Sequence, residues 1–563
     1  MCSLSQLNVF WIIVILTCAC LEPGSQSVQE SKLDDTDLFQ QDFTQSEDPN
    51  KLSKLRKLTR IEYSNALWDL FQIDVGTQTA NFPREDSSFG FTQIQNLSHF
   101  TSHRMEVQLN VATSIAPLIY DKINPIEVYF KGCVTPPSCP KSLDNFLREI
   151  GPKFHKGPLS DESLHLYTKL YESIPGDQRE KVTTVLTVML QSPNFLFSLP
   201  KDSPSFEMME KLSLFLWKSV PDENLQTIAA TLDPNDTQAV KALIRTMMED
   251  PRALRGLKAF FTDWLALNIL NGLNKDRNIL GNEADEQYMK DAKEEVLLLL
   301  LDLWNEDQNF KTLFDAPYTY VSQGLAKVYN MDDPGEGFRK VDLKDNPERF
   351  GFLSSAAFSA ILSKGVFSSP SARGLYVMRK FLCEDVPPPP PGLGAFPEEL
   401  RDMVLSPREK MARHAASEQC AGCHVLMDPI GMAFENYDAI GRFRNDYSAL
   451  KSWKFDFGDD PIQVANSIDV QGQKITFESP KALSQHIKDD YRFDHCFVTH
   501  LWEYAQSAPR PHGQEESQQP SWGDNINELT QHFAASGFKL KEIFAETAFR
   551  VLTTQPFHQK EEP

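Results

Sequence analysis

The chain has 563 residues, of which 41% are hydrophobic and 24% are charged, the balance of an ordinary folded protein. Its length exceeds what one compact core holds, so roughly two to four helical units are expected. The formal charge of −22, without any basic run, argues against nucleic acid as a partner, because phosphate binding needs clustered Lys and Arg. The acidic balance suits a basic redox partner or serves solubility.

The N-terminus has features of an export signal. The first twenty residues contain no charged side chain, and residues 10–16 (FWIIVIL) form an apolar run too short to span a bilayer. We therefore expect residues 1–20 to be a signal peptide and the protein to be exported to the periplasm or the cell surface. Cys20 is a candidate site for a lipid anchor. Residues 21–52 are polar and acidic, which predicts a disordered tether.

Helical patterns fill most of the chain after the tether, and no transmembrane span is expected in the mature protein. Thr59 and Glu62 have the spacing of a capping box, and the apolar residues Ile61, Leu67, Trp68 and Phe71 follow at roughly helical spacing. Residues 296–301 are apolar on every face but closely flanked by acids, which predicts a buried core helix. The predicted fold class is mainly α, with helical modules at 53–140, 141–204, 205–335, 348–447 and 448–563.

Two segments interrupt the helical patterns. The prolines at 387–391 predict a stiff polyproline linker inside the 348–447 module. Alternating apolar residues between 453 and 477 predict a small β excursion after that module.

The nine cysteines fall into three groups. Three lie in the leader, and two belong to a single CxxCH motif. The remaining four are an even number in a chain expected to be exported, which suggests disulfides. Cys133 and Cys139 bracket a short Pro-rich loop that is easily closed. By elimination, the second pair is then Cys383 with Cys496.

The pentapeptide 420–424 (CAGCH) is the strongest functional motif. On one helical turn, Cys420 and Cys423 can form thioether bonds to the two vinyl groups of a haem, while His424 ligates the iron. A structural zinc site would need a second, closely spaced ligand pair, and a thioredoxin-like redox pair would need a βαβ setting. Neither context is present in the sequence. We therefore expect one covalently bound haem c.

The second axial ligand of the iron is less well defined. Met427 follows His424 by one turn and would face the same side of the ring. His414 is the first candidate and Met432 the second. A methionine ligand would raise the reduction potential relative to histidine, and an empty position would permit ligand chemistry such as peroxide reduction.

The residues after the motif offer two further predictions. Residues 427–431 (MDPIG) have the composition of a turn. Arg442 and Arg444 are candidate partners for the haem propionates, because arginine favours bidentate contacts with carboxylates. Ion pairs with Glu435 or Asp438 are the alternative role for both arginines.

Several longer stretches resemble a known family of large exported proteins, abundant in planctomycetes and related bacteria. These proteins consist of consecutive modules described as domains of unknown function and associated with c-type haem. The stretches are LTRIEYSNALWDLF (58–71), LQSPNFLFSL (190–199), LSLFLWKSVPDENL (212–225), DPRALRGLKAFFTDWLAL (250–267), SPSARGLYVMRKFLCEDVPPPPP (369–391) and CAGCHVLMDPIGMAFENYDAIGRFR (420–444). The resemblance implies export, haem and an electron-transfer setting, and it implies no substrate. Many relatives carry a second CxxCH near the N-terminus, so this chain, which lacks it, should be monohaem.

The expected function is that of an exported monohaem c-type cytochrome-like protein, serving electron transfer or the entry of electrons into an oxidoreductase system. Its redox partner protein is unknown. No HExxH, GxSxG, P-loop or credible dinucleotide motif indicates a second chemistry. The alternatives are a haem-dependent, peroxidase-like enzyme and a surface interaction scaffold in which the haem is structural.

Overall fold

The computed structural model of the protein describes residues 56–554, except 84, 86–89, 95–100, 132–139, 282, 385, 387–404, 406, 417, 449–460, 471–472 and 510–519. Several predictions therefore lie outside the described residues. They concern the signal peptide, the lipid-anchor cysteine Cys20, the tether, the pair Cys133 and Cys139, and the polyproline linker at 387–391.

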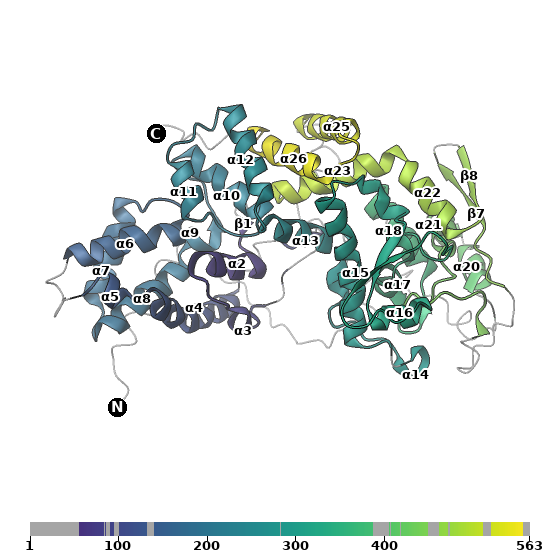
Figure 1. Cartoon of the computed structure of the whole chain (residues 1–563), viewed down its shortest axis with the longest axis horizontal. Helices are drawn as coiled ribbons and strands as arrows, with labels where there is room; N and C mark the ends of the chain where they lie inside the picture. Colours follow the sequence, from purple (N-terminus) through teal and green to yellow (C-terminus); the bar gives the residue numbers. More distant parts are fainter. Residues whose placement is uncertain are drawn as a thin grey trace. The chain divides into compact units, whose positions relative to one another are not determined.

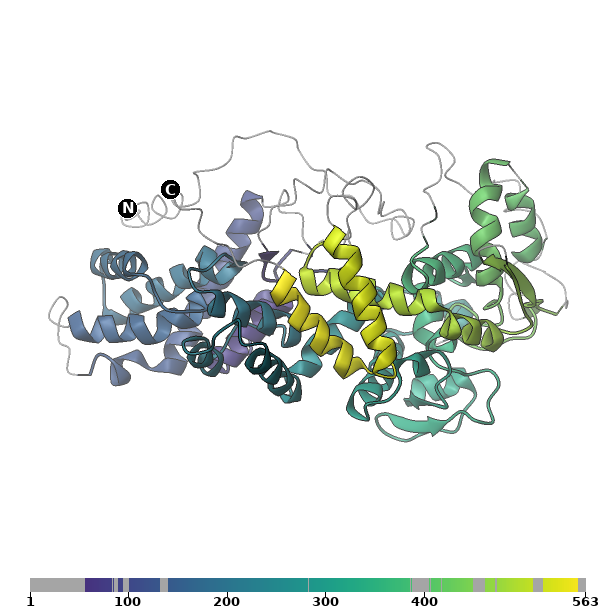
Figure 2. The same cartoon turned by 90° about the horizontal axis from the view of Figure 1, so that it is seen from above.

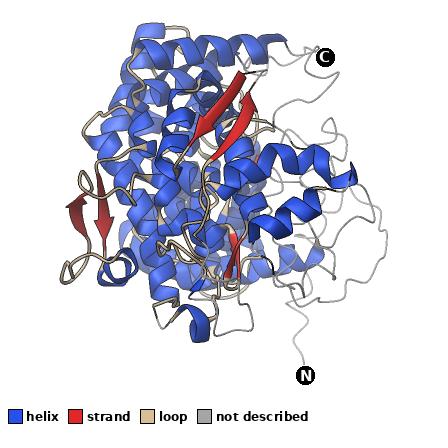
Figure 3. Cartoon of the chain, turned by 90° about the vertical axis from the view of Figure 1, so that its right-hand side faces the viewer, coloured by secondary structure: helices blue, strands red, loops and turns tan. Residues whose placement is uncertain are grey.

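The described part of the chain is predominantly helical, which confirms the predicted fold class (Figure 1, Figure 3). Its strands form four two-stranded antiparallel sheets. The last of these is the hairpin of β7 (Asn466–Val470) and β8 (Gln473–Phe477), so the β excursion predicted near 453–477 is present in its described portion. No helix among the described residues combines the length and the apolarity needed to cross a bilayer.

The N-terminal helices share one hydrophobic core, which extends from Leu58 to Val220. Strand β1 (Arg56–Lys57) pairs with β2 (Phe197–Ser198), which joins the start of this segment to the residues after α9. The core therefore spans the first two predicted modules. Its helices are α2 (Arg60–Phe71), α3 (Gly76–Thr79), α4 (Ser102–Ile123), α5 (Pro125–Val128), α6 (Pro140–His155), α7 (Asp161–Ser173), α8 (Gln178–Gln191) and α9 (Pro193–Leu196).

Helix α2 begins with the predicted capping box. The Thr59 side chain accepts a hydrogen bond from the Glu62 backbone N–H, and the Glu62 carboxylate accepts one from the Thr59 backbone N–H. The predicted periodicity is only partly right, because Ile61 and Trp68 are 52% and 44% exposed. Leu67 and Phe71 of the predicted pattern are buried, and Tyr63 and Ala66 share this buried face of α2.

A second, larger core is formed mainly by the chain from α10 onward, with Phe91 and Ile94 joining it from the N-terminal segment. It contains the predicted buried segment 296–301, which lies in α15 and buries Val296, Leu297, Leu299 and Leu300. Figure 2 shows α25 and α26 beside α23, in agreement with their packing contacts. The helices up to α17 are α10 (Pro204–Leu216), α11 (Glu223–Ala229), α12 (Thr237–Glu249), α13 (Ala253–Trp264), α14 (Arg277–Leu280), α15 (Glu286–Asn305), α16 (Gln323–Tyr329) and α17 (Ala356–Ile361). Those that follow are α18 (Pro370–Phe381), α20 (Pro407–Ala415), α21 (Glu418–Met432), α22 (Pro480–Asp489), α23 (Tyr491–Gln506), α25 (Pro520–Ala535) and α26 (Leu540–Thr554).

Short elements complete this part of the chain. Strands β3 (Tyr318–Val321) and β4 (Arg339–Asp342) form one hairpin, and β5 (Ser363–Lys364) and β6 (Phe367–Ser368) form another. Among the described residues, the 3₁₀ turns η4 (Leu267–Leu270), η5 (Phe310–Phe314) and η6 (Phe352–Ser354) link the helices.

The centre of the second core is aromatic. Trp264 on α13 is fully buried, with its ring centroid 5.3 Å from that of Phe497 and 5.6 Å from that of Phe381. Phe310 and Phe497 lie 4.4 Å apart, and Phe314 and Phe493 lie 4.7 Å apart. We call these six residues the aromatic core. It brings α13, α18 and α23 together with η5.

Helices α18 and α21 approach each other at backbone distance. A Cβ atom on Gly374 would lie 1.8 Å from the carbonyl oxygen of Met427, and one on Gly431 would lie 1.7 Å from that of Pro370. Larger residues at either glycine would therefore push the two helices apart. This contact holds the helix that carries the CxxCH motif against the second core.

Candidate functional site

Helix α21 carries Cys420, Cys423 and His424 within about one helical turn. Both cysteines are thiols of intermediate exposure, and Cys423 packs partly against the second core. Residues three and four apart on a helix lie on the same face. The two sulfurs and the imidazole therefore occupy neighbouring positions, as attachment to one porphyrin requires.

The turn predicted for residues 427–431 (MDPIG) is wrong, because these residues are helical. Helix α21 continues through Pro429 to Met432. A proline inside a helix removes one hydrogen bond and strains the preceding turn. Helix α21 runs through Pro429 where it packs closely against α18 at Gly374 and Gly431.

The continued helix places Asp428 four residues after His424. The Nδ1 atom of His424 lies 3.0 and 2.9 Å from the two carboxylate oxygens of Asp428. Ser371 on α18 donates a hydrogen bond of 2.7 Å to the same carboxylate. Both Asp428 and His424 are largely buried, at 12% and 14% side-chain exposure. The contact leaves Nε2 of His424 as the nitrogen available to a metal.

His414 on α20 lies directly beside His424. The ring centroids are 4.6 Å apart and the ring planes are nearly perpendicular. Burial lowers the pKa of His414, and the neighbouring His424 lowers it further. The structure thus brings the first candidate for the second axial ligand to the motif. A flat macrocycle cannot fit between two rings in direct contact, so His414 could ligate the opposite face only if α20 moved outward.

Met432, the second candidate, is not placed beside His424. Eight residues of one helix separate the two, which is about 12 Å along the helix axis. Its side chain is buried, at 3% exposure. Met432 is therefore a buried side chain away from the motif, not a neighbour of His424.

Arg442 and Arg444 adopt the roles given as the alternative to propionate binding. Arg444 forms an ion pair of 2.6 Å with Glu435, whose side chain is fully buried. Arg442 lies 3.7 Å from Asp438 and donates a hydrogen bond of 2.8 Å to the Leu280 carbonyl. Both arginines therefore stabilise the segment that follows α21.

Two buried arginines, which the sequence analysis did not single out, support the same segment. Arg373 on α18 is fully buried and donates hydrogen bonds to the carbonyl oxygens of Phe434 and Asp438. Arg349 donates to the carbonyl oxygen of Gly441 and stacks on Tyr329 with its guanidinium carbon 3.9 Å from the ring centroid. Guanidinium groups buried against backbone carbonyls fix a chain segment without a regular element. Their positions in the sequence carry no spacing signal that reveals this role.

A disulfide links α18 to α23. It joins Cys383, just after α18, to Cys496 on α23, the pair reached by elimination from the sequence, with a Cα–Cα distance of 5.3 Å. Nε2 of His500 lies 3.7 Å from the Cys383 sulfur, and its Nδ1 lies 3.1 Å from the Glu503 carboxylate. The two sulfurs are joined to each other, so this cluster does not offer thiolates to a metal.

The side chains of α21 fit a covalently attached haem. The motif presents two thiols and an imidazole whose Nδ1 is engaged by Asp428, which leaves Nε2 for a metal. Open space adjoins the motif at Gly422, where a Cβ atom would meet nothing within 4 Å. The site could therefore hold haem c through Cys420, Cys423 and His424.

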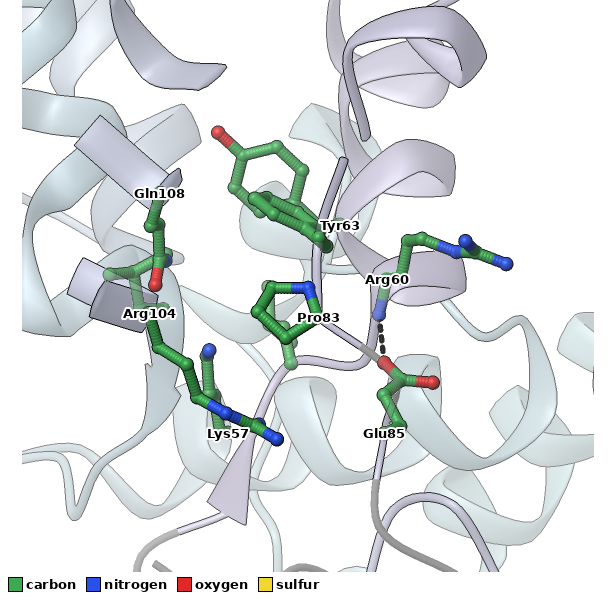
Figure 4. Close-up of a pocket in the computed structure, with 10 residues that line it drawn as sticks. Lys57, Arg60, Tyr63, Pro83, Glu85, Arg104 and Gln108 are labelled. Atoms are coloured by element: carbon green, nitrogen blue, oxygen red, sulfur yellow. Dashed lines mark hydrogen bonds between the residues drawn. The ribbon is translucent and has the colours of Figure 1, made fainter. Parts of the chain in front are cut away.

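A separate small pocket lies beside the start of α2 (Figure 4). Lys57 and Arg104 extend next to each other there, whereas the Arg60 side chain points away and its backbone N–H donates to the Glu85 carboxylate. Burial lowers the pKa of Lys57 to about 8, with a further contribution from Arg104, and burial raises that of Glu85. The residues that line the pocket include only one carboxylate, which is too few ligands for a metal site, and no sequence motif points to the pocket.

Comparison with known families gives three matches, each to a protein of unknown function. Residues 56–119 match DUF1587 (PSD3), residues 204–331 match DUF1592 (PSD4), and residues 349–447 match DUF1588 (PSCyt3). The last range contains the whole of α21. No curated protein and no solved structure is significantly similar to the chain. The chain therefore carries three consecutive domains of the DUF1587, DUF1592 and DUF1588 families, in the planctomycete-type, cytochrome c-associated arrangement.

Proposed function

We propose that the protein is an exported monohaem c-type cytochrome-like protein that transfers electrons or admits them to an oxidoreductase system. The arrangement of Cys420, Cys423 and His424 on one turn of α21 is the observation that carries this proposal. The cytochrome-associated character of the matched domains supports it.

Each residue of the site has a defined part in the proposal. Cys420 and Cys423 anchor the porphyrin edge, and His424 presents Nε2 to the iron. Asp428 contacts Nδ1 on the other side of the imidazole ring, and Ser371 donates a hydrogen bond to Asp428. The haem would supply a site for one-electron oxidation and reduction. The protein contributes attachment, orientation and a largely buried ligand.

The net charge of the chain indicates which kind of redox partner it would bind. A formal charge of −22 favours association with a basic protein, because complementary fields speed encounter. We propose a basic redox partner protein, and its association rate should fall as ionic strength rises.

The test is production of the full chain in a host competent for cytochrome maturation. The absorption spectrum of the reduced, purified protein should show separate α and β bands. Its haem should resist extraction by acid–acetone. Intact mass should show one haem per chain. A colourless protein, or haem that is extracted, would contradict the proposal.

A peroxidase-like activity is the second candidate, and one observation favours it. The two proposed axial ligands other than His424 are either too far along α21, as Met432 is, or in direct contact with His424, as His414 is. An iron held by His424 alone would have an open coordination position. Binding of cyanide to the oxidised protein, or of carbon monoxide to the reduced protein, would favour this candidate. A low-spin spectrum that neither ligand changes would exclude this candidate and leave electron transfer as the proposed function.

A further inference from the structure

The contact between His424 and Asp428 is the most specific polar arrangement of α21. One nitrogen of the imidazole faces both oxygens of a single carboxylate, at 2.9 and 3.0 Å. The two residues are four apart on the same helix, so the contact needs no movement of a loop to form. Asp428 lies under the packed interface with α18, where little water competes for its oxygens.

Ser371 limits what this arrangement can do. Its hydroxyl donates to Asp428 and not to the imidazole. In a serine nucleophile relay the histidine accepts the proton of the serine hydroxyl. The order here is serine, carboxylate, imidazole, so the three groups do not form such a relay. Ser371 instead anchors the carboxylate to α18.

The carboxylate determines which nitrogen of His424 carries the proton. A neutral imidazole has one N–H, and the hydrogen bond made by one nitrogen sets the role of the other. Because a carboxylate accepts only, Nδ1 must donate and Nε2 must be the lone-pair nitrogen. Metal-bound histidines commonly have such a partner, which orients the ring and raises the basicity of the ligand.

We infer that Asp428 is a positioning residue for His424. Ser371 modulates the strength of the hydrogen bond that Asp428 accepts from His424. Asp428 holds the tautomer and the ring angle that aim Nε2 away from α18, and it increases the electron donation of the imidazole toward a bound iron. This inference rests on the proposed function, since the iron is that of the haem expected at Cys420 and Cys423. A strong donor favours the oxidised iron, so the contact should lower the reduction potential.

The first experiment uses the haem-free chain and does not depend on the haem. Histidines labelled with ¹⁵N report their tautomers by the chemical shifts of the ring nitrogens at alkaline pH, where imidazole is neutral. The signal of His424, assigned by its loss in His424→Gln, should show a protonated Nδ1 and an unprotonated Nε2. In Asp428→Asn the fraction of this tautomer should fall. A His424 protonated at Nε2 in the unchanged chain would overturn the inference.

The second experiment measures the reduction potential of the haem-loaded full chain. Asp428→Asn should raise the potential, because an amide oxygen accepts more weakly than a carboxylate, and Asp428→Glu should restore part of the difference. Ser371→Ala should shift the potential in the opposite direction, because the carboxylate loses a competing donor. If Asp428 served only in packing, the reduction potentials of Asp428→Asn and Ser371→Ala would shift in the same direction or would not shift.

The control is Asp291→Asn on α15. Asp291 also accepts from a serine, Ser322, but contacts no histidine. Its substitution should leave the potential unchanged. If Asp428→Asn does not fold, Ser371→Ala and Asp428→Glu decide the question by the sign of their shifts. A colourless unchanged chain would defeat the proposed function, whereas a loaded chain with equal potentials in all variants would defeat only the role of Asp428.

Discussion

The aromatic core and the motif helix α21 use their side chains in opposite ways. In the aromatic core, Trp264 and Phe497 are fully buried and are surrounded by other rings. On α21, Val425 and Leu426 beside the motif are 66% and 44% exposed. The core buries apolar area and so stabilises the fold. Helix α21 is held chiefly from the side of α18, and among the described elements it also contacts α20 and β7.

This difference separates the parts of the molecule that fold the chain from the part that would bind the cofactor. A site that accepts a large planar group cannot be filled by side chains beforehand. Close backbone packing through Gly374 and Gly431 fixes the position of α21 without filling that face. We therefore expect substitutions in the two regions to have separable effects on stability and on haem.

The largest effect should come from removing the thiols of α21. The double variant Cys420→Ala/Cys423→Ala should lose covalent haem completely, since no thioether can form. The free energy of unfolding of the haem-free chain should change by no more than about 1 kcal/mol, because neither thiol is fully buried. Intact mass checks the first result and urea unfolding the second. A haem-free chain that unfolds without the thiols would show that the two regions are not separable.

The aromatic core should give the largest loss of stability. Trp264→Ala removes a fully buried ring with at least five aromatic neighbours and should lower the free energy of unfolding by about 3–5 kcal/mol. Trp68→Ala is the matched control, since Trp68 is 44% exposed, and it should change that free energy by about 0.5 kcal/mol or less. Equal effects in the two variants, measured by urea unfolding, would contradict the location of the core.

The disulfide ties the helix that supports α21 to the aromatic core. Replacing both Cys383 and Cys496 by Ala opens a link across 113 residues and should lower the free energy of unfolding by about 2–4 kcal/mol. Unfolding of the unchanged chain with and without a reductant should give a similar difference. Insensitivity to the reductant would show that the two cysteines are not joined.

A smaller, pH-dependent effect should arise from Glu295 on α15. Burial raises the pKa of this carboxyl from 4.5 to about 7, against the opposing hydrogen bonds from Thr319 and Tyr329. Between these values the folded chain binds a proton that the unfolded chain has released, so stability should fall as pH rises from about 4.5 to 7. The loss is at most about 3 kcal/mol.

Glu295→Gln tests this origin of the pH dependence. The variant should lack this part of the pH dependence, whereas Glu294→Gln, a change at the partly exposed neighbour, should keep it. Unfolding measured across the pH range decides between the two. An unchanged profile in Glu295→Gln would mean that Glu295 is already ionised in the fold.

Local signals predicted local structure well. The capping box at Thr59 and Glu62 depends on residues three apart, and the structure contains it. The burial of residues 296–301 follows from apolar side chains on every face of one helix. Ile61 and Trp68 show where such signals fail, because periodicity identifies a helix but does not state which face meets the core.

The features of the candidate site also fall into two groups, those that local spacing predicts and those that depend on packing between helices. The sequence by itself determined the mainly helical fold and the CxxCH motif, because both depend on spacing within a few residues. Only the tertiary structure decided that α21 continues through Pro429, that Asp428 faces His424, and that Arg444 pairs with Glu435. These features depend on α18, whose glycine lets the two backbones meet and whose Ser371 reaches the carboxylate. A contact between segments about fifty residues apart leaves no local pattern, so the packing of the helices had to reveal it.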